Sequence, residues 1–227
     1  KMLSLYIGNK NYSSWSMRAA VLLDAFDLAY TEHKLEFDDF SADGVFKQSI
    51  GKISAAGKVP VLVDGDITVW DSLAIAEYVA ETFPEKALWP QDKAARAHAR
   101  AIVAEMHSGF QTLRNACPMN IEADLAEVGR GLWQENTGLR ADVAYLETMW
   151  GALLADGREY LFGDFGIADA FYAPVVMRLK SYALPMNEVT LAYMARIQAH
   201  PAVDKWLQAA LKEKLFVAID EPYRQHR

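Results

Sequence analysis

Residues 57–84, GKVPVLVDGDITVWDSLAIAEYVAETFP, carry the clearest local structural pattern of the chain. Two short runs rich in β-branched residues, 59–63 and 67–70, flank an Asp-Gly pair, which is typical of a β-hairpin. Asp71 and Ser72 are then suited to cap a helix whose apolar positions recur at helical spacing, up to the proline that ends the stretch. The stretch therefore predicts two paired strands followed by a helix.

The residues before this stretch predict a strand, a helix and a second strand. Residues 3–7 form a short apolar run typical of a buried strand, and residues 16–25 carry apolar side chains at helical spacing. Residues 30–37 alternate weakly, which indicates the second strand. The order is a βαβ unit followed by ββα, so we expect a four-stranded sheet covered by helices. Val59-Pro60 is of the peptide type for which the cis form costs only about 0.5–1 kcal/mol.

The chain changes character after this first part. Residues 85–91 predict a linker, and beyond them good helix formers such as Ala, Leu and Glu dominate without a convincing strand. Roughly five helices are expected. The breaks between them are predicted near Pro118, Gly138, Gly157, Pro185 and Pro201. The sequence therefore predicts a mixed α/β domain over residues 1–84 and an all-α domain over residues 92–227.

Composition excludes several classes of function. The chain has 227 residues, 52% of them hydrophobic, and a net charge of −7, which argues against bulk binding to nucleic acid or to an anionic membrane. No apolar run approaches the roughly 20 residues of a membrane helix. The opening residues predict a strand and not a secretion signal. Cys117 is the single cysteine, so no internal disulfide is expected and a reducing cytoplasm is the expected location. The histidines show no metal-ligand spacing, and no metal is expected.

Motifs in both parts of the chain resemble those of the glutathione transferases. GKVPVL at residues 57–62 and WDSLAI at residues 70–75 are similar to the family's Val-Pro motif and its acidic-Ser motif. SSWSMR at residues 13–18 resembles the zeta-class serine motif SSCSWR, with Trp where that class has Cys and Met where it has Trp. FGIAD at residues 165–169 resembles the capping box FSIAD of the family's helical domain, with Gly in place of Ser. The resemblance implies an α/β thioredoxin-like N-terminal domain followed by an all-α helical bundle domain.

The resemblance also implies an activity. It points to a glutathione transferase of the general 2.5.1.18 type, which activates the glutathione thiolate for attack on a hydrophobic electrophile. A glutathione-dependent isomerase of the maleylacetoacetate type is the alternative within the enzyme class, and Trp15 in place of Cys counts against it. A non-catalytic binding module is the alternative outside that class, since a fold does not fix a function. A homodimer in the cytoplasm is expected from the resemblance, with no nucleic acid or membrane partner.

Hydroxyl groups before the first predicted helix suggest how a thiol is activated. A thiol has a pKa near 8.5, and lowering it by about two units is worth about 2.7 kcal/mol. A serine hydrogen bond and the N-terminus of the helix both favour the thiolate. Alignment with the family motif makes Ser13 the first choice for this role, with Ser14 close behind and Tyr12 third. The competing interpretation is that these serines only cap the helix.

No cysteine occupies this position. Thioredoxin-fold oxidoreductases carry Cys-x-x-Cys at the same junction, where this chain has Ser13 and Ser16. The reacting thiol must therefore arrive with the ligand. This disfavours a disulfide reductase.

The resemblance implies a binding role for residues beyond the serines. The main chain of Val59 is expected to hold the cysteinyl part of glutathione, and Asp71 and Ser72 its γ-glutamyl end. A helix N-terminus at Ser72 suits a carboxylate, although both residues would also serve as plain caps. Lys58 is either the partner of the glycyl carboxylate or an ordinary surface lysine. The predicted glutathione-binding residues are Ser13, Lys58, Val59, Pro60, Asp71 and Ser72.

The first helix after the linker is expected to contribute to the pocket of the second substrate. The residues spaced so that they share one broad face of this helix are Met106, His107, Phe110, Leu113, Arg114 and Cys117. The residues predicted for the pocket are Met106, His107, Phe110 and Arg114, together with Tyr12. His107 and Arg114 would suit an anionic or carbonyl substrate. The competing interpretation is that this face is bundle core, and that a buried cysteine such as Cys117 is inert.

Three further residues carry structural expectations. Asp169 is expected to cap a buried helix and not to act as a general base. Pro174 is expected to kink that helix or to break its start. Arg18 is expected to have a structural role outside catalysis.

Overall fold

A four-stranded mixed sheet forms the first part of the chain in the computed structural model, which describes residues 2–227. The strands are β1 Leu3–Ile7, β2 Tyr30–Lys34, β3 Val61–Asp64 and β4 Ile67–Val69. They lie in the order β2-β1-β3-β4, with β1 parallel to β2 and antiparallel to β3. In the central strand, Leu5 lies opposite Leu62 and is fully buried. The predicted succession of four strands along the chain and the hairpin at residues 64–67 are confirmed.

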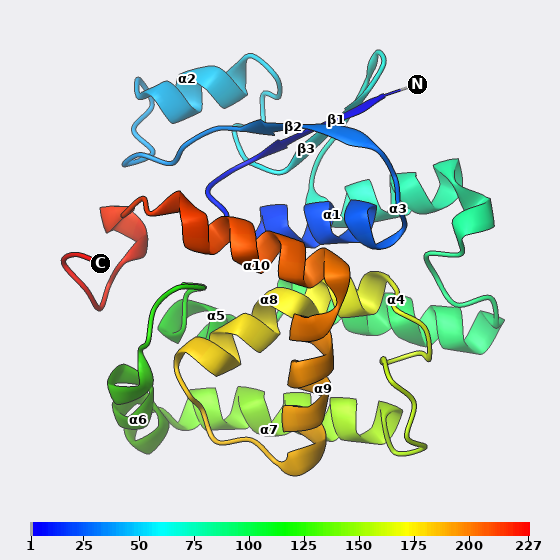
Figure 1. Ribbon diagram of the computed structural model, residues 1–227, viewed down its shortest axis with the longest axis vertical. Coiled ribbons are helices and arrows are strands. Elements are labelled where there is room, and N and C mark those ends of the chain that lie inside the picture. Colours follow the sequence, from blue (N-terminus) through cyan, green and yellow to red (C-terminus); the bar gives the residue numbers. More distant parts are fainter. Residues whose placement is uncertain (1) are drawn as a thin grey trace.

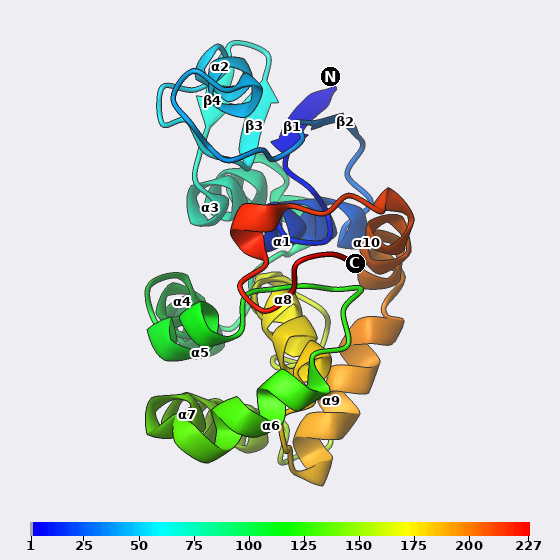
Figure 2. The same ribbon diagram turned by 90° about the vertical axis from the view of Figure 1, so that its left-hand side faces the viewer.

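Three helices accompany the sheet: α1 Ser14–Ala25, α2 Val45–Gly51 and α3 Ser72–Thr82. The helices α1 and α3 lie between the sheet and the rest of the molecule, while α2 lies on the opposite side of the sheet (Figures 1 and 2). The helix α1 is buried along most of its length, because it also packs against helices of the second part.

Some predicted boundaries in this part were wrong. The helix α1 begins at Ser14, two residues before the predicted start, and β2 ends at Lys34 instead of residue 37. The chain leaves the sheet here because Phe37 packs into an aromatic cluster with Phe40 and Phe46. The helix α2, which no pattern indicated, contributes Phe46 to the same cluster.

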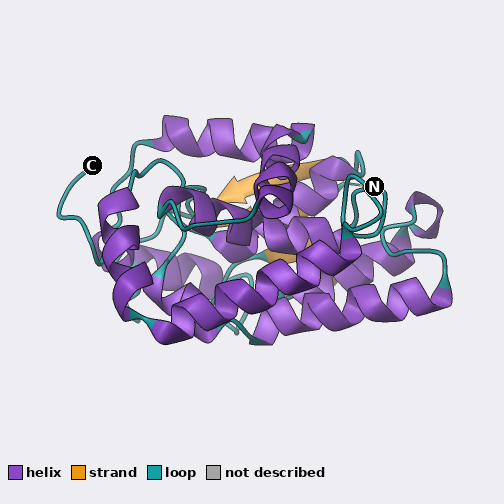
Figure 3. Cartoon of the chain, turned by 90° about the horizontal axis from the view of Figure 1, so that it is seen from below, coloured by secondary structure: helices purple, strands orange, loops and turns teal. Residues whose placement is uncertain are grey.

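Within the described residues, the second part of the chain contains helices joined by loops and no β-strand (Figure 3). Its elements are η1 Pro84–Lys86, α4 Lys93–Ser108, α5 Gln111–Ala116, α6 Ala126–Glu135, α7 Thr137–Leu153, α8 Ile167–Ser181, α9 Glu188–Ala199, α10 Pro201–Glu213 and η2 Ala218–Asp220. The helix α8 is buried along nearly its whole length and contacts both α1 and α4. The predicted fold class, a thioredoxin-like α/β part followed by an all-α part, is confirmed.

The predicted single helix that carries Met106 to Cys117 is in fact two helices. The helix α4 ends at Ser108, and α5 begins at Gln111 after Phe110 takes a left-handed conformation with φ of 55°. A Cβ atom on Gly109 would lie 2.6 Å from the carbonyl oxygen of Glu105, so glycine permits the tight turn. His107 and Arg114 therefore do not share one helical face.

Pro174 does not break the helix in which it lies. The helix α8 runs from Ile167 to Ser181, and its start is capped by Asp169, as predicted. The Asp169 carboxylate accepts hydrogen bonds from the main-chain N–H of Gly166 at 3.0 Å and of Leu161 at 3.2 Å. Dense packing around α8 compensates for the one ladder bond that a proline lacks.

One continuous hydrophobic cluster links the two parts of the chain. It joins residues of the sheet and of α1 and α3 to the buried faces of α4 and α7–α10. None of the helices within residues 2–227 combines the length and the apolar character of a membrane-spanning segment.

Candidate functional site

Two cavities lie side by side where the first part of the chain meets the second. The first, which we call the serine cavity, has a volume of about 290 Å³ and is lined by Tyr12, Ser13, Ser14, Trp15, Phe37, Phe40, Phe46, Lys47, Gly57, Lys58, Val59 and Asp220. The second, the cleft cavity, has about 280 Å³ and is lined by Trp15, Ala56, Lys58, Val59, Pro60, Trp70, Asp71, Ser72, His107 and Arg114. Trp15, Lys58 and Val59 line both. Every residue predicted to bind glutathione lines one or both cavities.

The loop before α1 is held from both sides. On the side of the sheet, the main-chain N–H of Ser13 donates to the Asn9 carbonyl at 2.8 Å. On the helical side, the buried Asn11 amide donates to Asn120 Oδ1 at 2.7 Å and accepts from the N–H of Glu122 at 2.8 Å. These bonds fix the position of the serines relative to the second part of the chain.

The two serines at the start of α1 have different hydrogen-bond partners. Ser13 Oγ donates to Ser16 Oγ at 2.6 Å, and Ser16 Oγ also accepts from the N–H of Gly8. Ser14 Oγ instead accepts a hydrogen bond from Arg178 Nη2 at 3.3 Å. The hydroxyl hydrogen of Ser14 has no acceptor among residues 2–227, so Ser14 can donate to a ligand in the serine cavity.

Tyr12 has a hydroxyl that is already committed. It donates to Glu221 Oε2 at 2.5 Å and accepts from the N–H of Val217 at 3.4 Å. Burial, together with the hydrogen bond to Glu221, raises the pKa of Tyr12 to about 12. Tyr12 therefore contributes its ring to the wall of the serine cavity and holds the C-terminal segment against the loop.

The start of α3 faces the cleft cavity. Asp71 Oδ1 caps the helix by accepting from the N–H groups of Leu73 at 3.0 Å and Ala74 at 3.2 Å. Asp71 Oδ2 lies 2.9 Å from His107 Nε2, which links α3 to α4. Ser72 Oγ is buried and has no hydrogen-bond partner among the described residues. The Trp70-Asp71 and Val59-Pro60 peptide bonds beside the cavity are both cis.

Trp15 forms the wall between the cavities. Two guanidinium groups lie near its ring, with the Cζ atoms of Arg18 at 4.4 Å and Arg114 at 4.9 Å from the ring centroid. The His107 ring contacts it edge-on at 5.3 Å. In the sequence, Trp15 stood out only because it departs from the zeta-class serine motif. In the structure, the Trp15 ring fills the space next to the serines.

The residues predicted for the second substrate are divided between cavity and core. His107 and Arg114 line the cleft cavity and Tyr12 the serine cavity. Met106 is fully buried and Phe110 is 8% exposed, and neither lines these two cavities. Cys117 is also fully buried, and burial raises the pKa of its thiol to about 12, which leaves it inert.

Two functional candidates were not indicated by sequence reasoning. Arg178 is one of three charged residues of α8, with Asp169 and Lys180, and no local feature of the sequence marks it as a site residue. Asp220 reaches the serine cavity from the C-terminal segment, and burial together with the charge of Glu221 raises its pKa to about 6. No sequence pattern links Asp220 to Ser14, because the two lie at opposite ends of the chain.

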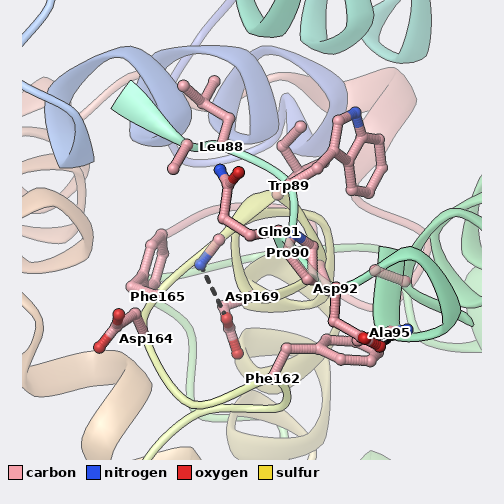
Figure 4. A pocket seen from close by; sticks show the side chains of 15 residues that line it. Leu88, Trp89, Pro90, Gln91, Asp92, Ala95, Phe162, Asp164, Phe165 and Asp169 are labelled. Atoms are coloured by element: carbon pink, nitrogen blue, oxygen red, sulfur yellow. Dashed lines mark hydrogen bonds between the residues drawn. The ribbon is translucent and has the colours of Figure 1, made fainter. Parts of the chain in front are cut away.

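A third cavity of about 290 Å³ lies away from the serines, between the linker, α4 and the start of α8 (Figure 4). Its walls are mainly apolar, and include Leu88, Trp89, Phe162 and Phe165. Its buried acid, Asp169, has its pKa raised to about 6 by burial, and accepts from Tyr193 Oη as well as from two main-chain groups. Asp169 is thus a structural cap. No group of three His, Cys, Asp or Glu side chains suited to a metal ion occurs within residues 2–227.

The protein therefore has a thioredoxin-like sheet with hydroxyl groups at the start of its first helix, and this part is joined to a helical bundle. Comparison with known families agrees. The model of the glutathione S-transferase N-terminal domain matches residues 4–81, and that of the C-terminal domain matches residues 93–209. The chain belongs to the glutathione S-transferase family.

Individual relatives carry two kinds of name. Glutathione S-transferase 1 of Dianthus caryophyllus is 31% identical over 192 residues, which cover 83% of each chain. A probable maleylacetoacetate isomerase of Caenorhabditis elegans is 31% identical over 208 residues, or 87% of this chain and 92% of that protein. Among solved structures, a glutathione transferase homolog from Burkholderia with bound glutathione has a TM-score of 0.71 at 26% identity, and covers 93% of this chain and 99% of that one.

Proposed function

We propose that the protein is a glutathione transferase that activates the thiol of glutathione for attack on a small electrophile. The observation that carries the proposal is Ser14: its hydroxyl is oriented by Arg178, its hydrogen has no acceptor among residues 2–227, and it lines a cavity at the start of a helix. The helix N-terminus adds unpaired N–H groups and a dipole that favour an anion at the same place.

The cleft cavity suits the remainder of the tripeptide. The unpartnered Ser72 hydroxyl and the start of α3 would hold the γ-glutamyl carboxylate. The main chain of Val59, which lines both cavities, would hold the cysteinyl residue and so direct its sulfur towards Ser14. The exposed Lys58 would pair with the glycyl carboxylate. This assignment extends glutathione along the wall formed by Trp15.

Activation consists of stabilising the thiolate. The thiol proton leaves to solvent, and the Ser14 hydroxyl then donates to the sulfur that remains. A thiol with a pKa near 8.5 is only a few per cent ionised at neutral pH, so a shift of about two units makes the thiolate the main species. Our assignment favours Ser14 over Ser13 because the Ser13 hydrogen is directed to Ser16.

An isomerase that uses glutathione is the second candidate. Arg114 lines the cleft cavity without a carboxylate partner among the described residues, which suits an anionic second substrate. Some relatives are named maleylacetoacetate isomerases. In either case we expect two domains, residues 1–84 and 92–227, and a homodimer in the cytoplasm, since symmetric pairs are the commonest assembly.

The pH dependence of conjugation tests the assignment of Ser14. Steady-state kcat/KM is measured from pH 6 to 9 with glutathione and an activated aryl halide, for the wild type and for Ser14→Ala and Ser13→Ala. Because Ser14→Ala returns the bound thiol towards its pKa near 8.5, we expect a loss of about 10- to 100-fold at pH 6.5 that disappears above about pH 9. Ser13→Ala should change the rate by less than about threefold.

Several outcomes would contradict the proposal. A larger loss in Ser13→Ala than in Ser14→Ala would transfer the role to Ser13. Binding of glutathione without turnover on a panel of aryl halides, epoxides and unsaturated carbonyl compounds would indicate a binding module. Isomerisation of a cis-unsaturated diketo acid without conjugation would favour the second candidate.

A further inference from the structure

Three guanidinium groups gather behind the start of α1. Arg18 comes from α1, Arg114 from α5 and Arg178 from α8, and none of them forms an ion pair with a carboxylate of the described chain. Arg18 is fully buried; its Nε donates to the Phe171 carbonyl at 2.8 Å, and its two other nitrogens have no hydrogen-bond partner within residues 2–227. Unpaired buried charge is costly, so a positive cluster of this kind suggests an anion that the chain itself does not supply.

Among residues 2–227, no carboxylate acts on Arg178 strongly enough to balance its charge. Burial, and then the positive charge of Arg114, lower its pKa to about 10, so it stays charged at neutral pH. Its other titratable neighbours are Arg18, Cys117 and Tyr182. Burial raises the pKa of Cys117 and of Tyr182, which keeps both neutral. The carboxylate that lines the neighbouring serine cavity is Asp220.

Arg178 makes contact with Ser14 from a fixed position. Its Nη1 donates to the carbonyl of Cys117 at 2.8 Å and to that of Arg114 at 3.1 Å, which anchors the guanidinium at the end of α5. Its Nη2 then donates to Ser14 Oγ. A serine hydroxyl has one hydrogen and two lone pairs, so an arginine on a lone pair directs the hydrogen elsewhere.

We propose that Arg178 is a positioning residue for thiol activation and acts on the bound sulfur through Ser14. The proposal rests on the function proposed above. Arg178 holds Ser14 Oγ as an acceptor and so turns its hydrogen towards the serine cavity, where it donates to the thiolate. A charged donor on Ser14 also polarises the hydroxyl and strengthens the bond that Ser14 makes. The sulfur anion becomes the counter-ion that the arginine cluster lacks.

A purely structural role for Arg178 is the alternative, because its bonds to two carbonyls also fasten α5. A double-mutant cycle separates the two roles. The pKa of the thiol of bound glutathione is measured from thiolate ultraviolet absorbance of the protein–glutathione complex. The proteins are the wild type, Arg178→Gln, Ser14→Ala and the double variant, with circular dichroism and thermal unfolding as checks on the fold.

Arg140→Gln is the matched control. Arg140 also donates to two main-chain carbonyls, those of Trp133 at 2.5 Å and Gln134 at 3.0 Å, but it lines neither cavity. Its replacement should lower the melting temperature and leave the thiol pKa unchanged. Arg178→Lys keeps the positive charge, and serves in the cycle if Arg178→Gln does not fold.

We expect the effect of replacing Arg178 on the thiol pKa to depend on the presence of Ser14. Arg178→Gln should raise the thiol pKa by about one unit when Ser14 is present and by less than about 0.3 unit in the Ser14→Ala background. Arg178→Lys should give about half the shift of Arg178→Gln, since it keeps the charge without the fixed fork. If the thiol pKa in Arg178→Lys is at least 0.3 unit above that of the wild type, this result alone supports the inference.

Three other results would overturn the positioning role of Arg178 or the function on which it rests. An unchanged thiol pKa in Arg178→Gln or Arg178→Lys, with a melting temperature lowered as in Arg140→Gln, would show a structural role only. Equal shifts with and without Ser14 would show a through-space charge effect and no positioning of the hydroxyl. A wild-type thiol that titrates like free glutathione would contradict the proposed function itself, whereas a lowered wild-type pKa that is insensitive to Arg178 would contradict this inference alone.

Discussion

Ser13 and Ser14 are adjacent in the chain and each is 7% exposed, yet their hydroxyls have different partners. The family motif includes both residues, and alignment with it favours Ser13. The distinction arises from Arg178, which is 164 residues away in the sequence. Local patterns predicted which group of residues surrounds the site, but the choice between neighbouring hydroxyls depends on a tertiary contact that no local pattern contains.

Replacement of Tyr12 tests the same distinction at a third hydroxyl. With a pKa of about 12, Tyr12 stays protonated at any pH used for an assay, and its hydrogen is held by Glu221. Tyr12→Phe should therefore leave the pKa of bound glutathione within about 0.3 unit of the wild type. It should also lower the free energy of unfolding by about 1–3 kcal/mol, because Glu221 loses a buried partner.

Titration of the bound thiol and denaturant unfolding check these two expectations separately. A rise of the thiol pKa in Tyr12→Phe as large as that in Ser14→Ala would show that the tyrosine activates the sulfur, and would contradict the assignment of Ser14.

At the scale of secondary structure, elements with strong local patterns were predicted best. The hairpin between β3 and β4 follows from an Asp-Gly pair, and the start of α3 from a capping aspartate that bonds two main-chain N–H groups. The break between α4 and α5 was missed, because it depends on the approach of Gly109 to the Glu105 carbonyl, which is invisible in a pattern of apolar residues. The helix α2 was missed since only two of its seven residues are buried.

Packing of α6 against the end of α8 gives a prediction at this scale. A Cβ atom on Gly129 would lie 1.8 Å from the carbonyl oxygen of Tyr182, whereas one on Gly131 in the same helix would meet nothing within 4 Å. Gly129→Ala should lower the free energy of unfolding by about 1–3 kcal/mol or more, because the two helices must separate. Gly131→Ala should raise it by about 0.5–1 kcal/mol, since alanine favours a helix.

Urea unfolding of both variants, followed by circular dichroism, makes the comparison. Similar stabilities for the two alanine variants would mean that α6 does not approach α8 as closely as the structure has it.

At the scale of the whole molecule, the site joins two parts of one continuous core. The first part supplies the serines, Val59 and the start of α3. The second part supplies His107, which contacts Asp71, and Arg178, which donates to Ser14. The resemblance of short motifs predicted the two-part fold and some of the residues that line the two cavities, but not Trp15 or Asp220. It did not predict which side chains of the helical part reach the site, because their positions depend on how α5 and α8 pack against α1. The domain limits 1–84 and 92–227 remain a prediction.

A crystal structure of the protein with bound glutathione would show whether the Ser14 hydroxyl donates to the sulfur. We expect the sulfur to lie within about 3.5 Å of Ser14 Oγ in the serine cavity, with Arg178 still bonded to that hydroxyl. The γ-glutamyl carboxylate should lie at Ser72 beyond Trp15. A sulfur that contacts Ser13 or Tyr12 instead, or a tripeptide bound outside both cavities, would contradict the account.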